Sequence, residues 1–276
     1  MTEGSGDDER RAFRTSVQPF GELQRFGPIT TNLEVPARAL AIGAHPDDIE
    51  IGCGGTMAKW AAAGCEIHHL VLTDGSKGTW DPDQDVASLV AARQEEQRAA
   101  ARLLGGGEVG FLGWPDGELR NTIREQWEVS RWIRHIRPDV VFGHDPWRRY
   151  RLHPDHRNAG FVVTDSLVAA RDPQFFADQD LAPHRPTALL LFEADVPNHV
   201  EDVAGFEQVK IDALLAHRSQ YETTLGIEGT PDDDSPGTSA DVGSLRVFAD
   251  RIRAQLAEHG ELAGFALGES FHRLEV

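Results

Sequence analysis

The chain has 276 residues, of which 40% are hydrophobic, and a formal net charge of -18 at pH 7. This acidic excess argues against a nucleic acid or an anionic membrane as partner, because binding a phosphate backbone relies on clustered cations. The length and apolar content fit one α/β domain with a large core, and no internal repeat or transmembrane span is visible.

Residues 1–36 differ in character from the rest of the chain. They open with a polar stretch from Gly4 to Arg11 and contain no apolar core of signal-peptide length. We therefore expect a partly disordered N-terminal extension, a cytoplasmic protein, and a single domain over residues 37–276.

The first strand, predicted near residues 38–44, leads directly into the polar turn His45-Pro46-Asp47-Asp48. Open α/β sheets bind ligands at the carboxyl ends of their strands. Pro46 fixes its own φ angle, so the turn holds one imidazole and two carboxylates with little freedom left. The pattern is typical of a metal or catalytic site.

A glycine-rich run, Gly52-Cys53-Gly54-Gly55, follows this turn. A dinucleotide-binding loop uses such a run, and Asp74 lies about 20 residues further on, where the ribose-binding acid would stand. We reject this interpretation because the third glycine of the G-x-G-x-x-G pattern would fall at Met57. The carboxylates of the preceding turn would also repel a pyrophosphate.

Strands and helices alternate along the chain, and short apolar runs such as Val140-Val141-Phe142 are typical of strands buried on both faces. Strands are predicted near residues 38–44, 66–73, 108–112, 139–143 and 187–192, and helices over residues 53–64, 87–104, 121–136, 154–171, 205–217 and about 244–258. The alternation predicts a three-layer αβα fold of the α/β class with a mostly parallel, Rossmann-like sheet. Residues 228–243 are predicted to form a flexible acidic loop, either a lid or a linker.

Several loops after predicted strands carry side chains suited to ligand contact. Trp80, Trp114 and Trp147 are expected in such loops, where a sugar or an aromatic ligand can stack on them. His144 ends the strand predicted at residues 139–143, and we expect it to line the pocket rather than bind a metal.

A basic cluster, Arg148, Arg149 and Arg151, lies beside the second polar motif. It either holds an anionic part of a substrate or pairs with local acids, and the sequence favours neither interpretation.

The second motif, His153-Pro154-Asp155-His156, lies about a hundred residues after the first. Because Pro154 is typical of the first helical position, His153 is expected at the helix cap and His156 in the first turn. Both imidazoles then project from one helix end. A catalytic zinc ion takes three protein ligands and keeps a fourth position for water, and His45, Asp48 and His156 supply three such ligands.

The two motifs together resemble those of the LmbE-like, or PIG-L, family of zinc-dependent N-deacetylases, which includes the mycothiol-pathway deacetylases. The resemblance extends from about Arg38 to Gln220. Weaker matches follow in the family's order: Arg93-Gln94-Glu95-Glu96, Leu103-Leu104-Gly105, Leu112 to Leu119, and His217-Arg218-Ser219-Gln220.

The resemblance implies that His45, Asp48 and His156 hold one Zn²⁺ ion per chain. Another divalent metal can occupy sites made of two histidines and a carboxylate.

The resemblance also implies catalytic roles for three neighbours of the metal ligands. Asp47 is the expected general base, and His153 the group that stabilises the developing oxyanion. Asp155 is expected to orient His153. Substrate contacts are expected from Arg93, Asp116 and His217.

The implied function is a hydrolase that removes an N-acetyl group from an amino sugar such as N-acetylglucosamine, or from a related conjugate. One alternative is an amidase that acts on a larger acyl or thiol conjugate. Another is a non-catalytic protein that binds a metal or a sugar, although such a protein has no need of a base like Asp47. The expected partner is a small N-acylated molecule, and a homo-oligomer is left open.

Overall fold

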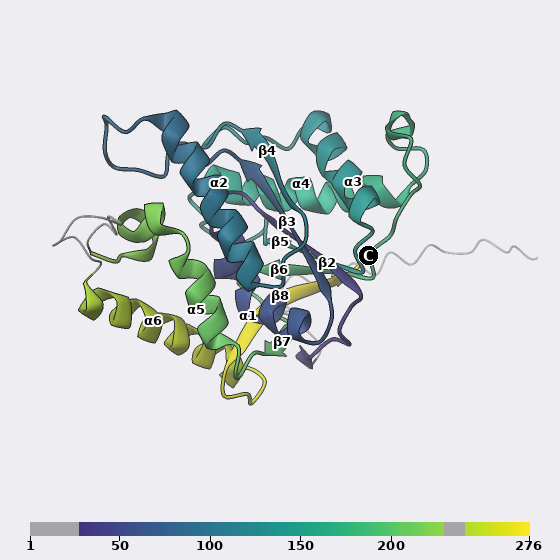
Figure 1. The fold of residues 1–276 in the computed structure, drawn as a ribbon. Helices are drawn as coiled ribbons and strands as arrows, with labels where there is room; N and C mark the ends of the chain where they lie inside the picture. Colours follow the sequence, from purple (N-terminus) through teal and green to yellow (C-terminus); the bar gives the residue numbers. More distant parts are fainter. Residues whose placement is uncertain (1–27, 229–240) are drawn as a thin grey trace, which may run out of the picture.

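The computed structural model describes residues 28–228 and 241–276 of the chain. Within these residues an eight-stranded sheet lies between layers of helices (Figure 1). The strands are β1 (Thr30–Thr31), β2 (Arg38–Gly43), β3 (Glu66–Thr73), β4 (Val109–Trp114), β5 (Val140–His144), β6 (Ala188–Phe192), β7 (His199–Asp202) and β8 (Gly268–Glu275). The helices are α1 (Asp48–Ala62), α2 (Val86–Leu103), α3 (Ile123–Ile136), α4 (Pro154–Arg171), α5 (Glu207–Leu215) and α6 (Val242–Glu261). Shorter helical turns lie at Ala177–Gln179, Arg218–Gln220 and Tyr221–Leu225.

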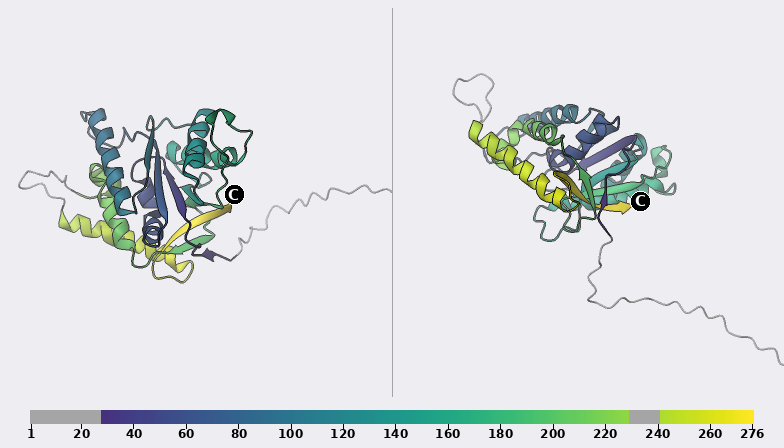
Figure 2. Two further views of the ribbon diagram at one scale, coloured as in Figure 1. Left: turned by 45° about the vertical axis from the view of Figure 1, so that its right-hand side comes forward. Right: turned by 90° about the horizontal axis from the view of Figure 1, so that it is seen from below.

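The helices cover both faces of the sheet, which confirms the predicted three-layer α/β fold. Helices α1, α2 and α5 pack on one face and α3 and α4 on the other, as the left panel of Figure 2 shows. Phe142 belongs to the core on the first face, where its ring lies 5.3 Å from that of Trp60. Its neighbour Val141 belongs to the core on the second face. Adjacent strand residues therefore enter different cores, which explains why the central strands are apolar throughout.

The order of the strands creates a ligand-binding edge. The sheet runs β1-β7-β8-β6-β5-β2-β3-β4, and β2 is parallel to both of its neighbours, β3 and β5. The chain leaves β2 through α1 on one face and leaves β5 through α4 on the other. Connections that diverge in this way open a crevice at the carboxyl ends of the strands. The segments after β2 and β5 meet there.

Three strands were not predicted from the sequence. Strands β1 and β7 pair in parallel, and β8 runs antiparallel to both β6 and β7, so the sheet is mostly rather than wholly parallel. Polar residues inside these strands, such as His199, Glu201 and Glu269, are buried and paired with one another or with lysines, so hydropathy does not mark the strands. Strand β1 places part of the sheet inside the segment expected to be an N-terminal extension.

The remaining expectations about the chain ends concern residues that the structure only partly describes. A disordered start is expected within residues 1–36, and residues 1–27 of that segment lie outside the described part of the chain. The acidic loop expected at residues 228–243 lies outside them over residues 229–240, and Val242 already belongs to α6. In the part of the chain that is described, no helix is long and apolar enough to cross a membrane.

Helix α1 begins at Asp48, whereas the sequence predicts a start at residue 53. The glycine-rich run at residues 52–55 therefore lies inside the helix. A Cβ atom on Gly52 would stand 2.5 Å from the Phe192 ring, and one on Gly54 would stand 3.2 Å from Lys210. These glycines therefore allow close packing of the helix and do not form a phosphate-binding loop.

A buried ion pair closes a break in α1 at Cys53, where the backbone is not helical. The Glu269 carboxylate accepts the backbone N–H groups of Gly55 at 2.8 Å and Thr56 at 2.7 Å. Lys210 donates to Glu269 at 2.6 Å and to the carbonyl of Ile51 at 2.7 Å. The pair thus satisfies backbone groups that the break leaves without helical partners.

Replacing Glu269 with Ala should lower the free energy of unfolding by about 3–5 kcal/mol, because it leaves the buried Lys210 ammonium without its counter-ion. Urea unfolding followed by circular dichroism measures the change. Glu275→Ala is the matched control, since this side chain on the same strand is 87% exposed. Equal stability of the two variants would contradict the role of the pair.

Candidate active site

The two polar motifs meet at the carboxyl ends of β2 and β5. These strands pair in parallel, with Ala41 opposite Phe142, so the turn after β2 lies beside the loop after β5. The first motif ends in the first turn of α1, and the second begins α4 with His153 as its N-cap. Two segments that are distant in sequence therefore contribute to one site.

His45, Asp48 and His156 bring three potential metal ligands together. His45 Nδ1 lies 3.2 Å from Asp48 Oδ2 and 3.1 Å from His156 Nε2, and His156 Nε2 lies 3.3 Å from Asp48 Oδ1. Ligands at about 2.0–2.1 Å from a tetrahedral zinc ion stand about 3.3 Å apart. The donor set and its spacing therefore fit a divalent ion.

The outer ring nitrogen of His45 faces two carboxylates. His45 Nε2 lies 3.1 Å from Asp155 Oδ2 and 3.2 Å from Asp116 Oδ1. When Nε2 carries the proton, the lone pair of Nδ1 points toward Asp48 and His156, where a metal ion would be held. Histidines that bind metals commonly have such an outer hydrogen bond. Burial alone would raise the pKa of Asp116, but its hydrogen bond with His45 lowers that pKa to about 2.

The hydrogen bonds of the Asp155 carboxylate go to groups other than His153. Besides His45, its carboxylate accepts the backbone N–H groups of Gly117 at 2.6 Å and Leu119 at 3.2 Å. Only its backbone N–H reaches His153, as the donor of the helix-capping bond. The side chain of Asp155 therefore holds His45 and the loop at residues 117–119, while its bond to His153 comes from the backbone.

His144 is closer to the metal-ligand set than the sequence suggested. His144 is the last residue of β5. Its Nε2 atom lies 3.2 Å from Asp48 Oδ2, and its Nδ1 atom lies 3.2 Å from Glu193 Oε2. Asp48, His144 and His156 are near enough to one another to form an alternative ligand set. Although burial would raise it, the pKa of Asp48 is held well below its usual range by His144 and His45.

The environment of Asp47 suits a proton acceptor. Asp47 is buried, lines the cavity, and has a φ of 104°, a backbone strain that persists only where the surrounding structure imposes it. Its backbone N–H donates to Gln97 Oε1 at 3.1 Å, and Arg93 Nη2 lies 3.4 Å from Asp47 Oδ2. Burial, partly opposed by Arg93, raises the pKa of Asp47 to about 6. A base of this strength is suited to proton transfer near neutral pH.

His153 lies exposed at the entrance of the site. Its Nδ1 atom accepts the backbone N–H of Asp155 at 3.3 Å, so a neutral ring carries its proton on Nε2. The ring stacks on His156 with centroids 4.8 Å apart. Partial burial and the neighbouring His45 lower the pKa of His153, which favours the neutral form.

The three expected substrate contacts differ in position. Asp116 and Arg93 line the cavity, but the Arg93 guanidinium is buried and donates to the backbone carbonyls of Gly75 and Pro46 at 2.8 and 2.7 Å. His217 is fully buried and pairs with Glu50 at 3.2 Å, outside the residues that line the cavity. Its position does not support a substrate contact, because it packs behind the turn that carries Asp47.

The basic cluster pairs with local acids. Arg148 and Arg151 contact Glu193 at 3.1 and 2.6 Å, and Arg149 contacts Asp195 at 3.2 Å. Arg151 also contacts the His156 ring. These pairs favour the structural interpretation of the cluster over binding of an anionic substrate.

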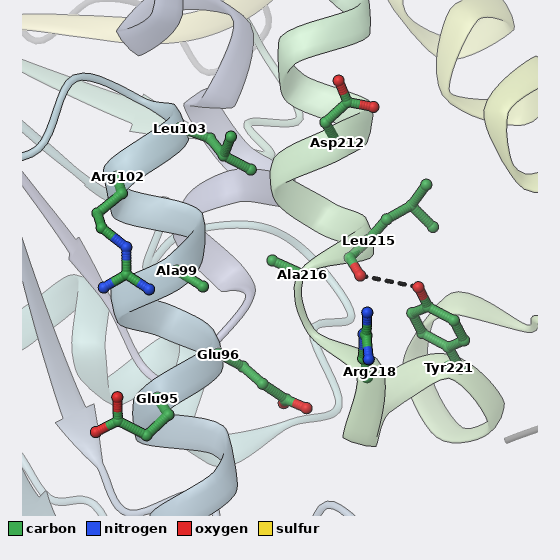
Figure 3. Close-up of a pocket in the computed structure, with 10 residues that line it drawn as sticks. All are labelled: Glu95, Glu96, Ala99, Arg102, Leu103, Asp212, Leu215, Ala216, Arg218 and Tyr221. Atoms are coloured by element: carbon green, nitrogen blue, oxygen red, sulfur yellow. Dashed lines mark hydrogen bonds between the residues drawn. The ribbon is translucent and has the colours of Figure 1, made fainter. Parts of the chain in front are cut away.

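The site opens into a cavity of about 410 Å³. Its lining includes His45, Asp47, Asp48, Asp116, His153 and His156. A different hollow of about 660 Å³ lies between α2 and α5 (Figure 3). Carboxylates such as Glu95 and Asp212 line it, but no histidine does, so it lacks the mixed donor set of the site. Of the three tryptophans expected in loops, Trp114 is instead the last residue of β4.

Comparison with known proteins identifies relatives of this chain. The family model described as PIG-L, GlcNAc-PI de-N-acetylase, matches residues 40–167. The diacetylchitobiose deacetylase of Thermococcus kodakarensis is 36% identical over 187 residues, covering 67% of this chain and 70% of that protein. The 1D-myo-inositol 2-acetamido-2-deoxy-alpha-D-glucopyranoside deacetylase of Streptomyces griseus is 31% identical over 210 residues, covering 65% of this chain and 62% of that protein.

Solved structures agree with these matches. The N,N'-diacetylchitobiose deacetylase of Pyrococcus horikoshii superposes with a TM-score of 0.75 and 30% sequence identity, covering 87% of this chain and 84% of that chain. The 4-carboxy-2-hydroxymuconate hydratase GalB of Pseudomonas putida KT2440 superposes with a TM-score of 0.66 at 19% identity, over 87% of this chain and 96% of that chain. The second likeness concerns the fold alone, so function must be argued from the site.

His156→Ala should lower the affinity for Zn²⁺ by about 100-fold or more, and Asp155→Asn by about 10- to 100-fold, since the first removes a donor and the second only loosens His45. Competition with a chromophoric chelator measures both values. His135→Ala is the control, because this exposed histidine pairs with Glu108 away from the site. An unchanged affinity in His156→Ala would exclude the proposed donor set.

Proposed function

The chain belongs to the PIG-L family of deacetylases, and from this premise we propose that it is a metal-dependent hydrolase of N-acetylated amino sugars or their conjugates. One observation carries the proposal. The two imidazole nitrogens of His45 and His156 lie 3.1 Å apart, and each lies 3.2 to 3.3 Å from one oxygen of the Asp48 carboxylate. The buried Asp47 lines the same cavity.

His45, Asp48 and His156 are the proposed ligands of the metal ion. Two nitrogens and one carboxylate fit Zn²⁺, and other divalent ions accept the same set. When bound, such an ion polarises the amide carbonyl and lowers the pKa of water to about 7.

Asp47 is the proposed general base. In this role it takes the proton from the water that attacks the acetyl carbonyl carbon, and a pKa of about 6, which leaves it ionised at neutral pH, supports the assignment. The Arg93 guanidinium holds this carboxylate and the Pro46 carbonyl, so Arg93 acts as a positioning residue. A positioning role also accounts for the burial of the Arg93 side chain.

His153 is the proposed donor to the developing oxyanion. Its Nδ1 atom is occupied by the helix-capping bond, which leaves the Nε2–H group free to donate from the entrance of the cavity. Preorganised donors of this kind stabilise charge that develops only in the transition state. The leaving amine must gain a proton, and the acid formed when Asp47 accepts one is adjacent to supply it.

The names of the relatives support an amino sugar as substrate. They are deacetylases of diacetylchitobiose and of a 2-acetamido-2-deoxyglucopyranoside linked to inositol. Both substrates carry an acetamido group on a pyranose ring. A cavity of about 410 Å³ is within the size range of small-molecule sites. We therefore propose an N-acetylglucosamine unit at the metal-ligand set.

Asp47→Asn should lower kcat for acetate release from N,N'-diacetylchitobiose by about 10²- to 10⁴-fold, because an amide cannot accept the proton. The bound metal, measured by elemental analysis, should stay at the wild-type level, since Asp47 is not among the proposed donors. Released amine and acetate are measured on zinc-loaded and chelated enzyme in parallel.

Asp250→Asn, on the exposed surface of α6, controls for the loss of one negative charge. The proposed base is refuted by an Asp47→Asn enzyme that keeps metal and turns over within threefold of the wild type. Release of only larger acyl groups by the wild-type enzyme would instead favour the amidase alternative.

A further inference from the structure

A second cavity, of about 790 Å³, adjoins the one that holds the donor set. It lies between the loop after β3 and the segment that follows α5. Its walls include Trp80, Asp81 and Gln84 from the first segment, and Ser219, Tyr221 and Glu222 from the second. None of these residues lines the metal cavity.

Two contacts join the second cavity to the first. Thr223 lines both cavities. The side chain of Gln220, which lines the metal cavity, donates to the carbonyl of Gly78 at 3.1 Å and accepts from Thr223 at 3.1 Å. Thr79 and Trp80, the next residues along the chain, belong to the second cavity. The Gln220 side chain and the loop that begins at Gly78 therefore separate two neighbouring cavities.

The lining of the second cavity suits a sugar ring. Trp80 is 70% exposed, although a large aromatic side chain normally gains by burial. Leu89 and Ile227 form a buried apolar floor, while Asp81 and Glu222 offer hydrogen-bond acceptors. A pyranose ring has an apolar face that stacks on an indole and hydroxyl groups that donate to carboxylates. Glu228 and one cation, Arg218, also line the cavity, so its acidic groups outnumber its basic one and disfavour an anionic group such as a phosphate.

We propose that this cavity is a subsite for a second, neutral sugar ring, which stacks on Trp80 while the N-acetyl group of the first ring occupies the metal cavity. The inference rests on the proposed function. It defines the preferred substrate as an N-acetylated disaccharide or a longer oligosaccharide, rather than a single amino sugar or a phosphorylated conjugate.

The test compares kcat/KM for N,N'-diacetylchitobiose with kcat/KM for N-acetylglucosamine. The wild-type enzyme should prefer the disaccharide. Trp80→Ala should reduce this preference by about 3- to 10-fold through the loss of stacking, and Trp80→Phe should restore most of it. Trp147→Ala is the matched control, because Trp147 is also exposed, packs on Phe161, and lines neither cavity.

Equal kcat/KM values for the two substrates in the wild type, or equal losses for both in Trp80→Ala, would overturn the subsite and leave the proposed function standing. If neither substrate is deacetylated, the proposed function fails, and calorimetric titration of the same disaccharide decides the subsite separately. Disaccharide binding that is lost in Trp80→Ala and kept in Trp147→Ala would still support the subsite. Absence of binding to the wild type would overturn it.

Discussion

The candidate site depends on the parallel pairing of β2 with β5. This pairing places the turn that carries His45, Asp47 and Asp48 beside the helix start that carries His156, across about a hundred residues of sequence. The helices that leave the two strands pack on opposite faces of the sheet, so no connection fills the crevice between them. The approach of His156 to His45 and Asp48 follows from this arrangement, whereas the contact between His45 and Asp48 is made within one turn.

Polar groups packed behind the site hold it in shape. Asp155 fixes the outer nitrogen of His45 and two backbone N–H groups, while Glu193 holds His144 against Asp48. Such groups are costly to bury and are tolerated only where each finds a partner. Further from the site, the buried pair of Glu269 and Lys210 also finds partners, because it bonds the backbone at the break in α1. The pair thereby supports the helix that begins with Asp48.

Much of this arrangement is predictable from the sequence because its signals are local. The apolar run before His45, the Pro154 that starts α4, and the helix cap at His153 are all visible within a few residues. The alternation of strands with helices likewise predicts the layers of the fold. Contacts between distant elements are not visible in this way. Predicting the approach of His144 to Asp48 would require the order of the strands in the sheet. Predicting the side-chain partners of Asp155 would require the position of the loop after β4.

Other differences have the same origin in tertiary packing. His217 resembles a substrate-binding residue by its motif, yet the chain after α5 places it against the buried Glu50. Strands β7 and β8 escape hydropathy analysis because buried polar pairs occupy their inner positions. The exposed Trp80 was predicted to lie in a ligand-binding loop, but the second cavity that gives it a specific role is formed with residues 218–228, far along the chain.

The most direct test of this account is an anomalous diffraction map at the zinc absorption edge, from crystals of the protein grown with Zn²⁺. We expect one peak within about 2.0–2.2 Å of His45 Nδ1, His156 Nε2 and a carboxylate oxygen of Asp48, with Asp47 outside bonding distance. A peak bonded to Asp47, or one centred on another set such as Asp116 and His153, would contradict the account.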